Sequence, residues 1–181
     1  MRRIYESDAL HRDTDAPFSP NERDDDDVRP QAARSIPSAA ITSAVLPGWV
    51  RHRSISVDVS VPATEFTAGS PVPFQVTMKN AMPFPVVIPT ESAIQWTWNV
   101  DGHRDASHFP LHDPPAGDDA ITFDRGERKR YRKRWDQMFR VSDDEWEQAT
   151  VGEHTIGAGL NVVDSPGKGL YDEATFRVVP E

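Results

Sequence analysis

The residues best suited to recognition chemistry form a basic cluster between Arg125 and Arg140. This cluster contains eight bases and two acids, a net charge of +6, whereas the rest of residues 51–181 has six bases and eighteen acids, a net charge of −12. A guanidinium group presents a planar fork of donors that pairs with a carboxylate through two hydrogen bonds. We therefore expect a recognition strip for an acidic protein partner, with these candidate residues: Arg125, Arg128, Arg130, Arg132 and Arg134.

Two other interpretations of the basic cluster remain open. In the first, it is a strand whose bases pair with acidic strands and loops of the same domain. In the second, it binds nucleic acid; the surrounding charge of −12 disfavours this, and at molar salt counterion release contributes little. A register that points Tyr131 and Trp135 into a core turns Arg130, Arg132 and Arg134 outward, about 6.5–7 Å apart.

Other chemistry-bearing residues are present but are not arranged for catalysis. His103, His108, His112 and Asp113 fall within eleven residues. Their spacing places His103 on a strand and His112 in a proline-rich loop, with no shared face on which imidazoles could converge on a metal ion. The sequence contains no cysteine, no Gly-x-Ser-x-Gly motif and no phosphate-binding loop. We expect no catalytic residue, metal or cofactor and predict that the protein is not an enzyme. No sequence feature indicates a small-molecule ligand.

The charge composition indicates a habitat. The chain has 19 Asp and 10 Glu against 16 Arg and 4 Lys, and its formal net charge is −9. Such a composition is expected of a halophilic, archaeal cytoplasm at molar salt, where a Debye length of about 3 Å screens self-repulsion. A high-GC genome is the alternative explanation for the excess of Arg over Lys. No apolar stretch predicts a transmembrane segment or an export signal, so we expect a cytoplasmic protein.

The first 50 residues differ from the rest of the chain. Residues 1–34 are poor in large apolar side chains and include the acidic run Asp24–Asp27, which predicts a disordered acidic arm. Alternatively, this arm folds on a partner through the apolar anchors Ile4, Tyr5 and Leu10. Residues 35–50 have apolar side chains at spacings of three to five and predict a short helix and linker. We expect this helix to begin at Ser38 and to end before Pro47.

From Ser54 onward, apolar and polar residues alternate with a period of two. Short strands are expected at 54–61, 72–79, 84–88, 94–100, 104–109, 121–123, 127–135, 154–162 and 176–178. Asp101-Gly102 predicts a two-residue hairpin turn, and Ser142–Glu147 predicts one helical turn. Trp96 and Trp98 are expected to share one face, with Trp135 reaching the same core. Residues 51–181 are therefore predicted to form one all-β sandwich of about seven to nine strands.

The order of several motifs resembles a known family. They are the strand Phe74–Asn80, Pro85–Ile88, Trp96-Thr-Trp98 before Asp101-Gly102, Arg125-Gly126-Glu127, Tyr131 with Trp135-Asp136, and Gly152–Ala158. Together they resemble the intracellular proteinase inhibitor domain called BsuPI, which implies an immunoglobulin-like β-sandwich. His154 stands where this resemblance leads us to expect a tyrosine. The whole chain is also similar to an uncharacterised haloarchaeal family with an arm-plus-sandwich layout.

Three functions follow as hypotheses. We expect a non-enzymatic module that presents loops and the basic strand to a protein partner. The BsuPI resemblance implies an alternative, an intracellular serine protease inhibitor, for which the loop Leu111–Ala120 is the candidate. The third hypothesis is a structural subunit whose arm is ordered in a larger assembly.

Overall fold

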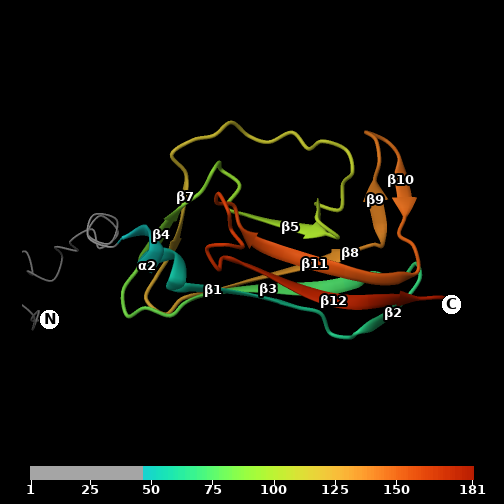
Figure 1. Cartoon of the computed structure of the whole chain (residues 1–181), viewed down its shortest axis with the longest axis horizontal. Coiled ribbons are helices and arrows are strands. Elements are labelled where there is room, and N and C mark those ends of the chain that lie inside the picture. Colours follow the sequence, from blue (N-terminus) through green and yellow to red (C-terminus); the bar gives the residue numbers. More distant parts are fainter. Residues whose placement is uncertain (1–46) are drawn as a thin grey trace, which may run out of the picture. The chain divides into compact units, whose positions relative to one another are not determined.

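The computed structural model describes residues 47–181, which contain one short helix and twelve strands (Figure 1). The elements are α2 (Gly48–Arg53), β1 (Ile55–Ser60), β2 (Glu65–Thr67), β3 (Val72–Asn80), β4 (Val86–Pro89), β5 (Trp96–Val100), β6 (His103–Arg104), β7 (Ala120–Phe123), β8 (Arg128–Trp135), β9 (Met138–Arg140), β10 (Trp146–Gln148), β11 (Gly152–Leu160) and β12 (Tyr171–Val179). Eight strands have four or more residues, and the other four have two or three. The predicted all-β sandwich is confirmed.

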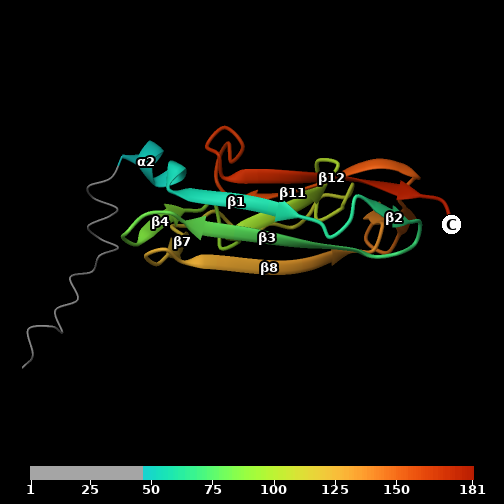
Figure 2. The same ribbon diagram turned by 90° about the horizontal axis from the view of Figure 1, so that it is seen from below.

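Two sheets make up most of the domain. The smaller has the order β1-β3-β8, and its three strands lie side by side in Figure 2. The larger has the order β2-β12-β11-β5-β6, in which only the pair β12 and β2 is parallel. Two further pairs, β4 with β7 and β9 with β10, lie outside these sheets. Strands distant in sequence are therefore neighbours, as a sandwich requires.

Aromatic side chains join the inner faces of the two sheets. The ring centroid of Phe74 on β3 lies 5.2 Å from that of Trp98 on β5, and Tyr131 on β8 lies 4.7 Å from Trp96 on β5. Trp98 and Trp135 are buried, as the expected strand faces predicted, whereas Trp96 is half-buried. The alternation of buried and accessible residues along these strands reflects the opposite directions of successive side chains.

The hairpin between β5 and β6 forms at the predicted turn. Asp101 and Gly102 have φ angles of 50° and 82°, the positive values that a type I′ turn requires. The return strand β6 is shorter than the predicted 104–109, because Asp105 and Ala106 also have positive φ angles, 50° and 52°, which are incompatible with a continuing strand. The chain therefore leaves the sheet early, and this loop becomes one wall of the pocket described below.

Two expectations about helices need comment. The arm of residues 1–34, with Ile4, Tyr5 and Leu10, lies outside the described residues, as does most of the predicted helix before Pro47. Pro47 itself is not helical, with a ψ angle of 145°, and α2 is a separate helix that starts directly after it and that the sequence pattern did not predict. A proline is tolerated next to a helix start because the first N–H groups have no intrahelical acceptor. No helix in residues 47–181 has the length and apolar character needed to cross a membrane.

The helical turn predicted for Ser142–Glu147 is wrong. Residues 142–145 lie in the connection between β9 and β10, whereas Trp146 and Glu147 belong to β10, and Trp146 pairs with Arg140 across that hairpin. The Arg140 guanidinium donates hydrogen bonds to the carbonyl oxygens of Ser142 and Asp143 and to the Asp143 carboxylate. Strand pairing and these bonds replace the local cap that the sequence pattern suggested.

Candidate binding surface on strand β8

Strand β8 carries four of the five predicted recognition residues on one side. Arg128, Arg130, Arg132 and Arg134 are exposed and alternate with the residues that face the other sheet. In the antiparallel pairing with β3, Arg128 lies opposite Lys79, which is also exposed. We call these five residues the basic face. The fifth predicted residue, Arg125, lies in the turn before β8 and is not part of this face.

The basic face has little acidic compensation within residues 47–181. Arg134 pairs with Asp136 at 3.2 Å, and Arg132 donates a hydrogen bond to the side-chain oxygen of Gln75. Arg128 and Arg130 form no ion pair with any described residue. The β3 residues opposite these arginines on the same face are Lys79, Thr77, Gln75 and Pro73. No acidic strand lies opposite these arginines among the described residues. Elsewhere in the cluster, four bases pair with acids of nearby turns and loops: Lys129 with Glu127, Lys133 with Asp105, Arg134 with Asp136 and Arg140 with Asp143.

The other side of β8 carries two lysines that point toward aromatic rings. The Lys133 ammonium lies 5.3 Å and 5.1 Å from the ring centroids of Trp96 and Trp98, and the Lys129 ammonium lies 5.4 Å from that of Phe123. These are cation–π distances. Because β8 is an edge strand in the described sheet, such inward-pointing charges protect the edge against pairing with another strand. The edge of β8 is therefore protected, and its four arginines lie on the outward side.

The turn before β8 is fixed by Glu127. Its carboxylate accepts hydrogen bonds from the Asp124 backbone N–H and from the Lys129 ammonium, at 2.7 Å and 2.9 Å. These bonds, led by the one from the Asp124 N–H, hold the pKa of Glu127 below its usual value. Gly126 takes the positive φ angle, 65°, that the turn requires. Glu127 thus remains ionised and neutralises Lys129 rather than an arginine of the basic face.

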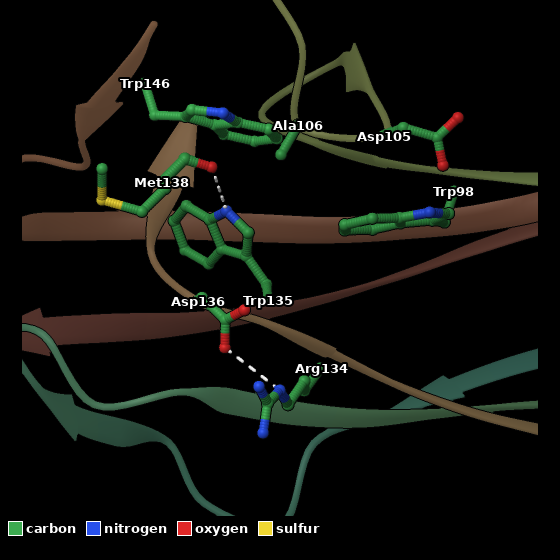
Figure 3. Close-up of a pocket in the computed structure, with 8 residues that line it drawn as sticks. All are labelled: Trp98, Asp105, Ala106, Arg134, Trp135, Asp136, Met138 and Trp146. Atoms are coloured by element: carbon green, nitrogen blue, oxygen red, sulfur yellow. Dashed lines mark hydrogen bonds and ion pairs between the residues drawn. The ribbon is translucent and has the colours of Figure 1, made fainter. Parts of the chain in front are cut away.

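A pocket of about 500 Å³ lies where β8 ends (Figure 3). Residues from four segments line it: Trp98, Asp105, Ala106, Arg134, Trp135, Asp136, Met138 and Trp146. Arg134 belongs both to this pocket and to the basic face. The sequence showed no periodic signal for the pocket, because its residues come from β5, the segment after β6, the stretch 134–138 from the end of β8 to the start of β9, and β10. Their common location depends on the tertiary fold.

Buried hydrogen bonds hold the pocket in shape. The Trp135 indole N–H donates to the carbonyl oxygen of Met138 at 2.9 Å. Between these residues, the fully buried Gln137 accepts a bond from the Gly69 N–H and donates one to the Thr67 carbonyl oxygen, at 2.9 Å and 3.0 Å. The φ angle of Gln137 is 57°. The tight connection from β8 to β9 is therefore anchored to the turn before β3.

Residues 43–179 match a protein family described as a family of unknown function (DUF7974). The chain belongs to this family. No curated protein matches the chain.

Several solved structures are similar to this DUF7974 chain. A CARDB domain from Pyrococcus furiosus, in complex with di-metal ions, is 14% identical with a TM-score of 0.44, over 70% of this chain and 94% of that chain. A β-glucosidase from Listeria innocua is 15% identical with a TM-score of 0.41, over 70% and 16%. An alkylpurine DNA glycosylase from Pseudomonas fluorescens, bound to DNA, is 13% identical with a TM-score of 0.40, over 70% and 30%. The DUF7974 chain thus spans only a small part of the two enzymes.

Two histidines of the cluster pack together. The rings of His103 and His108 stack with centroids 4.0 Å apart, and both rings contact Phe139 edge-on. This packing on Phe139 brings together two residues from either side of the bend after β6. Asp113 accepts hydrogen bonds from Arg104. Within residues 47–181, no group of three or more His, Asp or Glu side chains is placed to hold a metal ion.

Proposed function

We propose that this domain is a non-enzymatic protein-binding module whose basic face binds an acidic surface of a protein partner. The observation that carries the proposal is the row of four exposed arginines on β8, of which Arg128 and Arg130 form no ion pair with any described residue. The remainder of residues 51–181 has a net charge of −12, so the row stands out electrostatically from its surroundings.

The spacing of the row suits carboxylates. Alternate residues of a strand lie about 6.5–7 Å apart, twice the rise per residue. Each guanidinium can take one carboxylate in a two-bond pair, which is stronger and more directional than diffuse attraction between charges. A partner with several neighbouring Asp or Glu side chains fulfils this requirement. The same acidic surroundings repel the phosphates of a nucleic acid, which supports a protein partner.

The test replaces Arg128, Arg130 and Arg132 by Gln. Arg134 is kept because it pairs with Asp136 and lines the pocket. A matched control replaces Arg53, Lys168 and Arg177 by Gln, which changes the net charge equally at positions outside the basic face. Each tagged protein is used for capture from native cytosol at native salt, with mass spectrometry as the readout. We expect recovery of the partner to fall at least tenfold for the β8 variant only.

Thermal unfolding separates binding from folding. If the β8 variant loses stability while partner recovery per folded molecule is unchanged, the row has a structural role and the proposal is overturned. Equal recovery of the partner with wild type, β8 variant and control also overturns the proposal. The composition supports a cytoplasm at molar salt as the setting, and the resemblance to the haloarchaeal arm-plus-sandwich family agrees with it.

Serine protease inhibition is a second candidate, favoured by the loop 111–120. Most of its residues are exposed, including His112 and Asp113, yet the loop is fixed at three places. Asp113 pairs with Arg104 at 2.7 Å, Ala116 forms a bridge with Ser92, and the Asp119 carbonyl oxygen accepts the Thr90 N–H. A preorganised loop loses little entropy on entering a protease cleft. A residual-activity assay with a subtilisin-type protease tests this candidate. The structural-subunit hypothesis concerns the arm and stays a prediction.

A further inference from the structure

The pocket at the end of β8 is built around three tryptophans. Trp98 and Trp135 are buried, whereas Trp146 on the β9–β10 hairpin is 54% exposed (Figure 3). Its volume of about 500 Å³ lies in the range of small-molecule sites, which are lined mainly by apolar and aromatic side chains with a few placed polar groups. Met138 and Ala106 complete the apolar lining, while Arg134, Asp105 and Asp136 provide the polar groups.

Each charged group of the pocket already has an ion-pair partner, in the pocket or beside it. Arg134 lies 3.2 Å from Asp136, and Asp105 lies 4.0 Å from Lys133 and 3.8 Å from Arg104. An ionic ligand would have to compete with these pairs, so it gains little from charge alone. A neutral ligand with hydroxyl groups can bond to the same side chains and leave the pairs in place, because a carboxylate and a guanidinium retain further acceptor and donor positions.

The buried indole nitrogen of Trp98 does not select a ligand. Trp98 is 9% exposed, and its nitrogen is closed to solvent and has no hydrogen-bond partner among the described residues. A ligand in the pocket therefore meets the Trp98 ring rather than its N–H. The Lys133 ammonium lies 5.1 Å from the same ring.

The backbone around the pocket is strained. Five non-glycine residues between 47 and 181 have positive φ angles; of these, Asp105 and Ala106 line the pocket, and Gln137 lies between the lining residues Asp136 and Met138. Such conformations cost of order 1–3 kcal/mol each and persist where the surrounding structure holds them. The bonds of Gln137 and Trp135 provide that support. The pocket is therefore preformed.

From these features we infer that the pocket binds a neutral sugar unit of a carbohydrate. A pyranose ring offers an apolar face of C–H groups for the exposed Trp146 ring and a rim of hydroxyls. The hydroxyls donate to Asp105 and Asp136 and accept from Arg134. The pocket and the basic face take different ligands, a neutral sugar and an acidic protein surface. Only Arg134 belongs to both.

A glycan array identifies the ligand. The full-length wild-type chain is screened at molar KCl, and the best neutral oligosaccharide is titrated while tryptophan fluorescence is recorded. We expect saturable binding and a spectral shift. Trp146→Ala should weaken the affinity at least tenfold, and Asp136→Asn at least threefold. Trp49→Ala is the matched control, because Trp49 is 65% exposed on α2 and lies outside the pocket, and it should bind as wild type does.

Three outcomes overturn the inference. The first is the absence of binding to any glycan on the array. The second is unchanged affinity in both Trp146→Ala and Asp136→Asn; the Asn variant preserves the side-chain shape, so it carries the test if the Ala variant does not fold. The third is binding only to sulfated or uronic glycans that is lost when Arg128, Arg130 and Arg132 are replaced by Gln, because this would place the ligand on the basic face. Neutral-glycan binding by that triple variant supports the pocket.

Discussion

Asn80 illustrates how one side chain organises the start of β8. It is fully buried, and its amide nitrogen donates to the carbonyl oxygens of Phe84 and Asp124, each at 2.9 Å. Its amide oxygen accepts the Met82 N–H at 2.9 Å. Asn80 therefore joins the end of β3, the loop before β4 and the turn before β8. The asparagine noted at the end of this strand in the sequence has a structural reason, because only a side chain with both donors and an acceptor satisfies all these groups.

Replacing Asn80 by Asp should destabilise the domain strongly. A carboxylate would face the Phe84 and Asp124 carbonyl oxygens in a buried place and could not donate to them. We expect a loss of about 3 kcal/mol or more in the free energy of unfolding at pH 7, measured by chemical denaturation. Asn99→Asp is the control, because Asn99 is only half-buried and bonds to the Tyr171 hydroxyl. Equal stability of the two variants would mean that Asn80 does not hold these segments together.

The edge strand β8 combines the proposed recognition surface with protection against aggregation. Its arginines lie on the outward side, whereas Lys129 and Lys133 lie on the inward side near aromatic rings. A charge on the inward side of an edge strand must be buried when another strand pairs there, which is costly. Two copies of β8 would also bring their arginine rows together. Both features disfavour backbone pairing at β8 and leave its outward side chains exposed.

Removing both inward lysines should allow the β8 edge to pair with a strand of another molecule. In the double variant Lys129→Val and Lys133→Val, the edge loses its buried charges and gains β-branched residues that favour strands. We expect concentration-dependent self-association in analytical ultracentrifugation, where the wild type stays in one species over the same range. The control is Lys79→Val, which removes an outward lysine from β3. Association of this control to the same extent would show that net charge, not the edge, is responsible.

The strand faces were predictable from sequence, but the pocket was not. Tyr131 and Trp135 established the register of β8, because residues two apart must lie on one face of a strand. Trp146 shows the limit of this reasoning: the pattern at Ser142–Glu147 matches a helix cap, but pairing of β10 with β9 overrides it. The positive φ angles at Asp105, Ala106 and Gln137 have no signature in residue type, since none of them is a glycine. The pocket depends on these bends.

The distribution of charge over the chain separates two regions of opposite sign. The basic cluster at 125–140 has a net charge of +6 and the rest of residues 51–181 has −12, within a chain of net charge −9. At molar salt the Debye length is about 3 Å, so each charge interacts only with its immediate neighbours. Under these conditions, a row of arginines recognises carboxylates only by direct contact, so two-bond pairing rather than long-range attraction would determine its specificity.

The stability of the domain should depend on salt. At about 0.1 M KCl the Debye length grows to about 10 Å, and unscreened repulsion among the excess acids then opposes folding. We expect the near-UV circular dichroism of the tryptophans to weaken and Tm to fall by roughly 10 °C relative to molar KCl, which corresponds to about 3 kcal/mol for a domain of this size. A neutral osmolyte added at 0.1 M KCl is the control, because it favours compact states without screening charge. If Tm and the tryptophan signal are the same at both salt concentrations, the acidic composition reflects genome bias, and the halophilic setting proposed for this domain is wrong.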